Sequence, residues 1–546
     1  MSDRRRRSAK VSEGPSEART KRGGGLIRSS LIFSGLTLVS RMLGFVRDIF
    51  ITARLGASAT VAADAYNTAL AFPNLFRRIF AEGAFAAAFV PAYSRSLTGD
   101  GEEVADKLAS DALATLAAAT LLLTVIAQLA MPWLMYGINP GYVDDPEKFR
   151  LAIFLTQITM PYLPCMAITA LLSGVLNARG RFIFSAAAPI LLNAAILVAV
   201  IPEQSAEQAA ESASWAVIVA GVAQAALIWW GARRTGARII LRLPRLTPEI
   251  KALIALAIPG AIAASATQIN IFISGVLASQ VAGARSWLAV ADRLYQLPLG
   301  LVGVAVGVAL LPRLSQALQA DDKDDAQTAT DQAIVFSLAL TLPAAAALMA
   351  MPYFLIDGLF TRGEFTALDA RATADALFHY GWGVPAFVLL RVMSPIFFAR
   401  QDTKSPMRFA LLSVAVNIGL GIVLFYLIGF EGIAAATSVA TWITILQMSL
   451  ALSKSGAYRP SKAAWGKIVR VLAASVALGL ILFAAEIYRP QIVEALRSKE
   501  VAIVLLTALA GALYPLLLFA SGGVTIGEVR ALLRRRRGVA AKPDAG

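Results

Sequence analysis

Apolar residues along this chain gather in long runs rather than in the short alternations of a globular protein. Each run is close to the ~20 residues that an α-helix needs to cross a lipid bilayer. Because irregular backbone does not face lipid, the pattern predicts an all-α polytopic membrane protein. We count fourteen runs, which begin near Leu31, Ala62, Leu108, Leu151, Ile183, Trp215, Ile250, Trp287, Ile334, Ala372, Phe409, Ile433, Ile468 and Val501.

Composition supports this interpretation and excludes several kinds of site. Of 546 residues, 57% are hydrophobic and 16% are charged, whereas soluble domains carry about 25% charged residues. Cys165 is the single cysteine and His379 the single histidine, so neither an internal disulfide nor a cysteine-based metal cluster is possible. The sequence GxxxxGK[ST] of a phosphate-binding loop does not occur. We expect no cofactor, no bound metal and no enzymatic activity.

Basic residues set the expected orientation, because loops rich in Lys and Arg stay in the cytoplasm. An even number of spans puts both basic tails in the cytoplasm: residues 1–28, expected to be disordered, and residues 523–546. These tails are interpreted as topology anchors that touch anionic lipid headgroups, not as nucleic-acid-binding segments. One loop expected outside breaks the rule, because it carries Arg489, Arg497 and Lys499.

The two halves of the chain resemble one another at an offset of about 221 residues. AMPW at 130–133 matches AMPY at 350–353, FVPAYSRSL from Phe89 matches LLPRLSQAL from Leu310, Pro164 matches Pro385, and Ala178–Arg179 matches Ala399–Arg400. Six spans separate the copies, so both insert the same way, as in carriers built from parallel repeats. We predict two pseudo-symmetric six-helix lobes, residues 29–235 and 236–455, followed by two extra helices in residues 456–522.

Several predicted spans hold charges at depths where each charge costs at least ~2.5–3.5 kcal/mol. At 1.5 Å per residue, Arg41 lies about 15 Å into the first span, near the membrane centre, and Arg77 reaches a similar depth in the second. The same count puts Arg47, Asp48 and Arg293 in the outer half. The other candidates are Asp64, Asp292, Arg54, Arg391 and the pair Arg78 and Glu82, which are four residues apart on one helix.

Arginines outnumber acids among these residues, so salt bridges between helices do not account for all of them. A cavity with surplus arginine suits an anion such as phosphate, because the guanidinium presents a planar fork of donors and stays charged on burial. We expect Arg41 and Arg77 to hold the anion near the membrane centre. Arg47, Asp48 and Arg293 are expected to close the outer side, joining the first lobe to the second.

Five motifs resemble those of the MviN/MurJ family of bacterial lipid II flippases, in the multidrug/oligosaccharidyl-lipid/polysaccharide exporter superfamily. They are SRMLGFVRD (40–48), ADAY (63–66), FPNLFRRIFAEGAFAAAFVP (72–91), ADRLYQLPLGLVGVAVGVALLP (291–312) and RQDTKSP (400–406). The resemblance covers essentially the whole chain after the basic N-terminal tail. It implies fourteen helices, with a groove for the polyprenyl tail formed by the last two.

Motif position also carries over residue roles. The family's important arginines, which bind pyrophosphate, and its important acids fall on Arg41, Arg47, Arg77, Arg293, Asp48 and Asp64. The chain departs from the family at Ala71, where members often have lysine before the LPN motif. The number of positive charges in the site is therefore not fixed by the resemblance.

The implied function is a flippase that moves lipid II, an undecaprenyl-pyrophosphate glycopeptide, between leaflets by alternating access. The direction is from the inner to the outer leaflet of the bacterial cytoplasmic membrane, and the cell-wall synthesis machinery would be a further partner besides the membrane lipids. A flippase for another undecaprenyl-pyrophosphate-linked oligosaccharide is the alternative, since the charge argument fits both. A membrane glycosyltransferase would need an acidic site and a sizeable outer domain, for which the loops are too short.

Overall fold

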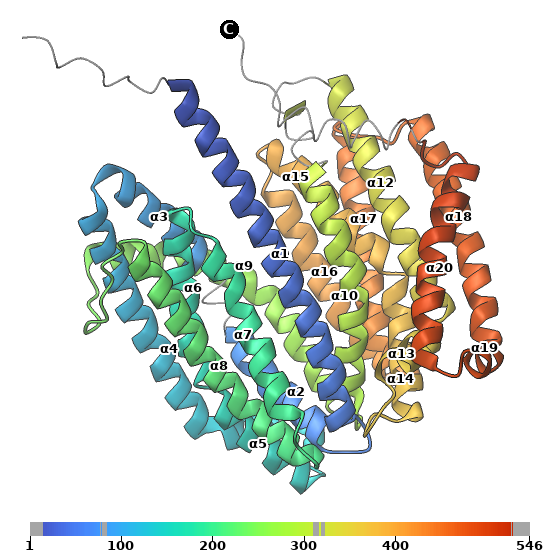
Figure 1. Ribbon diagram of the computed structural model, residues 1–546, viewed down its shortest axis with the longest axis horizontal. Helices are drawn as coiled ribbons and strands as arrows, with labels where there is room; N and C mark the ends of the chain where they lie inside the picture. The colour runs from blue at the N-terminus through green and yellow to red at the C-terminus, as the bar shows by residue number, and fades with distance from the viewer. Residues whose placement is uncertain are drawn as a thin grey trace, which may run out of the picture.

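The computed structural model describes residues 15–76, 78, 85–309, 316–317, 323–525 and 527 (Figure 1). Within these residues the chain is helical, without strands, and ten helical segments are long and apolar enough to cross a membrane. Each of the fourteen predicted starting positions lies inside a helix. The prediction of an all-α polytopic membrane protein is confirmed at this level.

Eight helices form the first half of the described chain. They are α1 (Pro15–Leu55), α2 (Ala62–Phe76), α3 (Phe85–Gly99), α4 (Glu102–Ile138), α5 (Pro146–Thr159), α6 (Tyr162–Ala178), α7 (Ile183–Val200) and α8 (Ala206–Arg234). Helix α1 begins at Pro15, within the N-terminal tail of residues 1–28, and the expected disorder of that tail stays a prediction. Proline is favoured in the first helical turn, and the Glu, Ala, Arg and Lys that follow it are good helix formers.

The second half contains the helices α9 (Pro248–Ala278), α10 (Ala284–Ala309), α12 (Lys323–Ala350), α13 (Pro352–Phe360), α14 (Ala367–Gly381), α15 (Val384–Ala399), α16 (Lys404–Ile428), α17 (Glu431–Lys454), α18 (Lys462–Ile487), α19 (Arg489–Leu496) and α20 (Lys499–Ala520). The matched motifs AMPW and AMPY differ in local structure. Pro132 lies inside the continuous helix α4, whereas Pro352 starts α13 after a break. A proline removes one backbone donor and crowds the preceding turn, so both outcomes are available to the motif.

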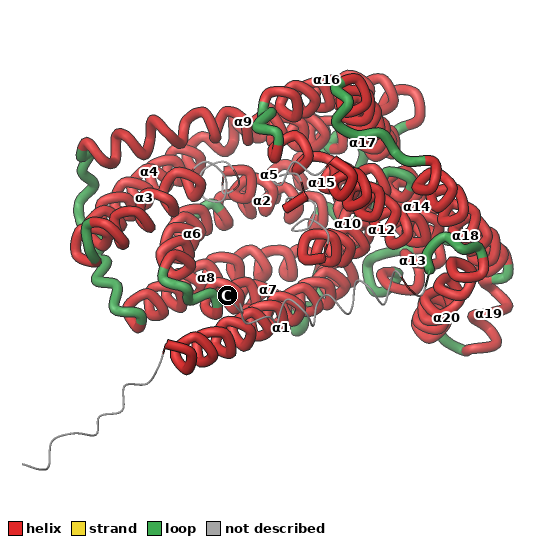
Figure 2. Tube along the Cα trace, turned by 90° about the horizontal axis from the view of Figure 1, so that it is seen from above, coloured by secondary structure: helices red, strands yellow, loops and turns green. Residues whose placement is uncertain are grey.

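The helices gather into two bundles (Figures 1 and 2). Helices α1–α8 form the N-terminal bundle and α10–α17 the C-terminal bundle, while α18 and α20 pack on α12 and α13. Helix α9 belongs to both, because it packs against α3 and α4 as well as against α16. The bundles meet at what we call the convergent end, formed by the loops 56–61 and 279–283, and spread apart at the opposite end (Figure 1).

Matching hydrogen bonds at the spread end accompany the Ala-Arg motifs that the sequence paired. Arg179 donates from Nη1 to the carbonyl of Thr235 at 3.1 Å, and Arg400 donates from Nη2 to the carbonyl of Ala457 at 3.3 Å. Each arginine thus holds the segment that leaves its half of the chain. Arg179 is tied further by an ion pair of 2.8 Å to Asp106, so the two copies share a position but differ in strength.

Two of the three basic residues in the loop that broke the charge rule share one carboxylate in the structure. Asp357 of α13 accepts from Arg489 at 2.5 Å and from Lys499 at 3.4 Å. Lys499 also donates to the carbonyl of Thr361 at 2.6 Å. Two of the three basic side chains therefore fasten the α19 region to α13, and they do not act as free charges near a membrane surface.

Candidate functional site

A cavity of about 510 Å³ lies between the two bundles and is lined by residues of α2, α9 and α10. Its polar lining includes two cations, Arg78 and Arg285, together with the side chains of Asn67, Thr68, Asn74, Gln268, Asn270, Asp292 and Gln296. A cavity of about 80 Å³, lined by Arg47, Asp48 and Arg293, shares Asn67 and Ala289 with it. No group of His, Cys, Asp and Glu suited to a metal ion occurs among the described residues.

The structure brings together the three residues predicted to join the halves in the outer region. Arg47 donates to Asp48 through Nε at 3.0 Å and through Nη2 at 2.5 Å. Arg293 of α10 lies with its Nε 3.2 Å from the other carboxylate oxygen of Asp48. Arg47 also donates to Asn193 of α7 at 2.8 Å, and Asn193 donates in turn to the carbonyl of Ser40. One carboxylate therefore links α1 to α10, and an amide fixes its neighbouring arginine.

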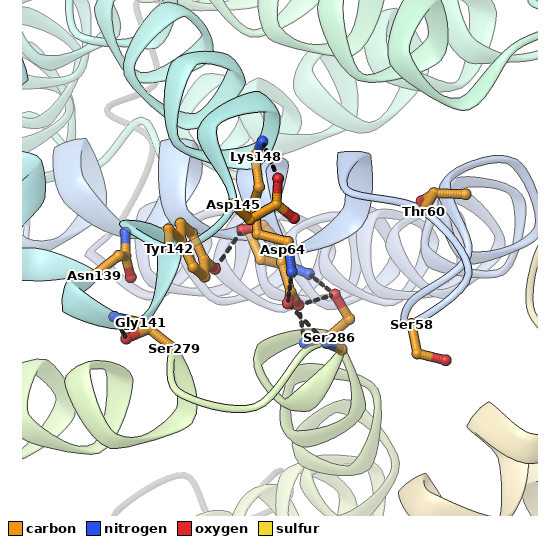
Figure 3. Close-up of polar contacts among 12 residues, drawn as sticks. Ser58, Thr60, Asp64, Asn139, Gly141, Tyr142, Asp145, Lys148, Ser279 and Ser286 are labelled. Carbon is orange, nitrogen blue, oxygen red and sulfur yellow. Dashed lines mark hydrogen bonds and ion pairs between the residues drawn. The ribbon is translucent and has the colours of Figure 1, made fainter.

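Asp64, predicted as an important acid, caps the facing bundle from the first turn of α2 (Figure 3). Its carboxylate accepts from the backbone N–H of Gly283 at 2.8 Å, the N–H of Ser286 at 3.1 Å and the Ser286 hydroxyl at 2.8 Å. Lys148 lies 3.4 Å away. The orphan N–H groups and positive dipole end of α10 suit a carboxylate. With no exposed surface, Asp64 is a fully satisfied buried anion that joins two bundles.

A second buried carboxylate makes the reciprocal connection. Asp369 of α14 accepts from the N–H of Ser58 at 3.0 Å and from its hydroxyl at 2.5 Å, so the C-terminal bundle holds the loop after α1. Trp287 donates to the same oxygen at 2.9 Å, and Thr366 closes a capping box on the other oxygen. Asp369 has no exposed surface. The convergent end is therefore fastened from both sides by anions that accept backbone N–H groups.

The remaining predicted residues have fewer partners. Arg41 is exposed and has no ion pair among the described residues, and its guanidinium lies against Gly300 of α10. Arg54 donates to the carbonyl of Ile201 at 2.8 Å. Arg391 is an exposed residue of α15. Asp292 accepts from Gln296 at the cavity wall that Arg78 also lines. Arg77 and Glu82 lie outside the described residues, so the pairing of Arg78 with Glu82 stays a prediction.

Sequence reasoning missed Asp369, Lys148, Asn193 and Arg285. Asp369 follows Thr366 by three residues, a spacing that indicates a local helix cap. The spacing gives no sign that Asp369 also contacts the other bundle. Arg285 stands only eight residues before Arg293, and a search for every charge near a predicted span would have found it. The partners of Asp64 come from loops and helix starts, where the apolar pattern carries no information.

Comparisons with known proteins agree with this architecture. The family model described as "Lipid II flippase MurJ" matches residues 51–497. The chain is 40% identical over 520 residues to "Probable lipid II flippase MurJ" of Rhizobium tropici, covering 94% of this chain and 97% of that protein. It is 34% identical over 460 residues to "Lipid II flippase MurJ" of Burkholderia cenocepacia, covering 83% and 89%.

Two solved structures share the fold. "Lipid II flippase MurJ, inward closed conformation" superposes with a TM-score of 0.73 at 22% identity, covering 89% of this chain and 98% of that one. A multidrug resistance MATE family transporter of the MOP superfamily, in an inward-facing conformation, gives a TM-score of 0.62 at 16% identity, covering 78% and 98%. The family match over most of the chain and the close relatives lead to one conclusion: this chain belongs to the lipid II flippase MurJ family.

Proposed function

We propose that this protein moves lipid II from the inner to the outer leaflet of the bacterial cytoplasmic membrane by alternating access. The observation that carries the proposal is the central cavity, which holds the cations Arg78 and Arg285 without a carboxylate at ion-pair distance among the described residues. A guanidinium keeps its charge on burial, so this cavity favours an anionic ligand. Family membership supports lipid II as that ligand.

Two further parts of the proposal concern architecture. Passes between the spread end and the convergent end, counted over the described helices, support fourteen spans arranged as two six-span lobes with α18 and α20 added. Both described ends of the chain lie at the spread end (Figure 1). We assign that end to the cytoplasm, because it carries the basic linker 236–246. The convergent end then faces outward, and its carboxylate contacts hold the outer side shut.

Within this scheme Arg41 and Arg77 receive the pyrophosphate, and Arg47, Asp48 and Arg293 form a closure that breaks when the bundles separate. A ligand shifts such an equilibrium only by binding one state better than the other. Pyrophosphate supplies that difference if it competes with Asp48 for the arginines. The wall-synthesis machinery would use the lipid II that is delivered outside.

The decisive experiment is transport in proteoliposomes. Fluorescently labelled lipid II is incorporated into vesicles that contain the purified protein, and a membrane-impermeant reductant then reports the fraction in the accessible leaflet over time. We expect faster exchange than in protein-free vesicles. Arg408→Gln is the matched control and should retain the wild-type rate, because Arg408 is an exposed residue of α16 that lines neither cavity. Exchange no faster than in protein-free vesicles would refute the proposal.

The same vesicles separate lipid II from the alternative cargo. An undecaprenyl-pyrophosphate-linked oligosaccharide without peptide replaces lipid II in a parallel experiment. Equal or faster exchange of that lipid would favour the broader lipid-linked oligosaccharide flippase over the lipid II flippase.

The orientation can be tested in cells. Single cysteines in residues 202–205 should react with an impermeant maleimide in intact cells, whereas cysteines in residues 236–246 should not. The opposite labelling pattern would reverse the assignment of the convergent end.

A further inference from the structure

Arg285 has surroundings unlike those of the arginines that join the bundles. It stands in the first turn of α10 and lines the central cavity. Its Nη2 makes one long hydrogen bond, of 3.5 Å, to the carbonyl of Ile138, and its Nε is buried without a partner. No carboxylate lies at ion-pair distance from it among the described residues. A Cβ at Gly275 would stand 2.6 Å from Nη2, so the guanidinium occupies space that a glycine of α9 leaves open.

A buried acceptor without a partner lies in the same cavity. The side-chain oxygen of Asn270, on α9, is buried and accepts no hydrogen bond. A buried polar atom that lacks a partner is costly, and most such atoms in proteins are satisfied. The wall of one cavity therefore combines a permanent cation with a buried acceptor that has no partner, and this combination suits a ligand carrying both an anion and an N–H donor.

The position of Arg285 argues against the pyrophosphate as its ligand. Arg41 lies against Gly300, which is fifteen residues along α10 from Arg285. At 1.5 Å per residue, these points are about 22 Å apart along the helix, several times the size of a pyrophosphate. A single lipid that places its pyrophosphate at Arg41 must present a different anionic group to Arg285.

We propose that the convergent end of the cavity is a subsite for the peptide part of the head group, with Arg285 binding a peptide carboxylate. Asn270 accepts from a peptide N–H beside it, and the hydroxyl and amides of Thr68, Asn67 and Gln268 surround the neutral polar part. This inference rests on the proposed function, and it specifies what the head group needs besides pyrophosphate. Ala71 of α2 also lines the cavity, at the position where family members often have lysine. Arg285 supplies a positive charge in the cavity that Ala71 does not.

Binding to the purified full-length protein in detergent tests the subsite, with three probes: lipid II, undecaprenyl pyrophosphate, and lipid II whose peptide carboxylates are amidated. Arg285→Gln should weaken lipid II binding by roughly tenfold or more, because it removes a charge-assisted hydrogen bond. The same variant should bind undecaprenyl pyrophosphate as the wild type does. Arg41→Gln is the matched variant and should weaken both ligands.

Binding of amidated lipid II to the wild-type protein also tests whether Arg285 binds a peptide carboxylate. This experiment does not depend on the folding of a variant. It should bind about as weakly as native lipid II binds to Arg285→Gln. Equal loss of both ligands in Arg285→Gln would make Arg285 another pyrophosphate residue, and full affinity for amidated lipid II would also overturn the subsite. A wild-type protein that binds undecaprenyl pyrophosphate but gains nothing from the glycopeptide refutes the subsite alone. One that binds neither lipid refutes the proposed function, and the subsite with it.

Discussion

The charged residues between the bundles form two groups with opposite surroundings. At the convergent end, Asp64 and Asp369 have no exposed surface, and each accepts hydrogen bonds from the facing bundle. Along the space between the bundles, Arg41, Arg78 and Arg285 have no carboxylate at ion-pair distance among the described residues. The first group is satisfied by the protein itself. The second group has charge left over, and the family's substrate is anionic at its pyrophosphate.

The difference follows from what each group can neutralise. A carboxylate is satisfied by backbone N–H groups at a helix start. In the proposed scheme, Asp64 and Asp369 lose these partners when the bundles part. A guanidinium has only donors, and neutral carbonyls can accept from it, but only an anionic acceptor neutralises its charge. In the proposed scheme, Asp64 and Asp369 at the contact hold the closure without ligand, and Arg78 and Arg285 in the cavity stay available for a ligand. Each group then predicts a different response to mutation.

The largest effect on stability is expected at Asp64. Asp64→Ala leaves the ammonium of Lys148, whose side chain is 7% exposed, and the N–H groups of Gly283 and Ser286 without an acceptor. Removing one partner of a buried ion pair costs about 3–5 kcal/mol, so the free energy of unfolding should fall by that amount in SDS-induced unfolding of the purified protein. Asp100→Ala, at an exposed position, should stay within ~0.5 kcal/mol of wild type. A fully stable Asp64→Ala protein would contradict the closure.

Asp369 should have a smaller effect, because no ammonium depends on it. Asp369→Asn weakens hydrogen bonds to a charged group, each worth about 1.5–3 kcal/mol, and should loosen the loop after α1. Ala57, with no exposed surface, packs into the hydrophobic cluster of the C-terminal bundle. In a Cys165→Ser background, Ala57→Cys should react with a soluble maleimide about tenfold faster when Asp369→Asn is added.

A neighbouring cysteine controls for general loosening in that experiment. Ala59 is already exposed, so Ala59→Cys should react at the same rate with and without Asp369→Asn. If the rate at Ala57→Cys does not change, the contact of Asp369 with Ser58 does not hold the bundles together.

The link between Asp48 and Arg293 should be weaker still. The Arg293 side chain is 52% exposed, and exposed ion pairs contribute only about 0.2–1 kcal/mol. A double-mutant cycle with Asp48→Asn and Arg293→Gln, measured by SDS-induced unfolding, should give a coupling energy in that range. A coupling near zero would remove this pair from the closure, and one above ~3 kcal/mol would rank it with Asp64.

The depth of the charged residues could be predicted from the sequence, but most of their partners could not. Helical rise is fixed, so counting residues put Arg47, Asp48 and Arg293 at one level, and the structure brings them into contact. Asp369 was missed because its capping box with Thr366 is a sufficient local explanation. Its second role depends on Ser58, more than three hundred residues away in sequence, and no periodicity relates two such positions.

The repeat was also only partly informative. It paired Arg179 with Arg400, and both hold the segment that follows their half. It did not predict that Arg179 would also donate hydrogen bonds to Tyr93 and Asp106, since surrounding residues diverge between the copies. The offset also assigned α9 to the second half and did not predict that this helix packs on both bundles.

Arg41 is expected to show the smallest effect on stability together with a large effect on function. Its guanidinium is exposed and has no ion pair among the described residues, so Arg41→Gln should change the free energy of unfolding by no more than ~0.5 kcal/mol. In proteoliposomes the same variant should lower lipid II exchange at least about tenfold, because a charge-assisted contact to pyrophosphate is lost. Both measurements use one preparation, so misfolding cannot imitate the result. A loss of stability close to that of Asp64→Ala would make Arg41 a structural residue. The arginines between the bundles would then not differ in role from the acids at the convergent end. Loss of transport at unchanged stability would mean that the partner of Arg41 is absent from the folded protein and arrives with the ligand.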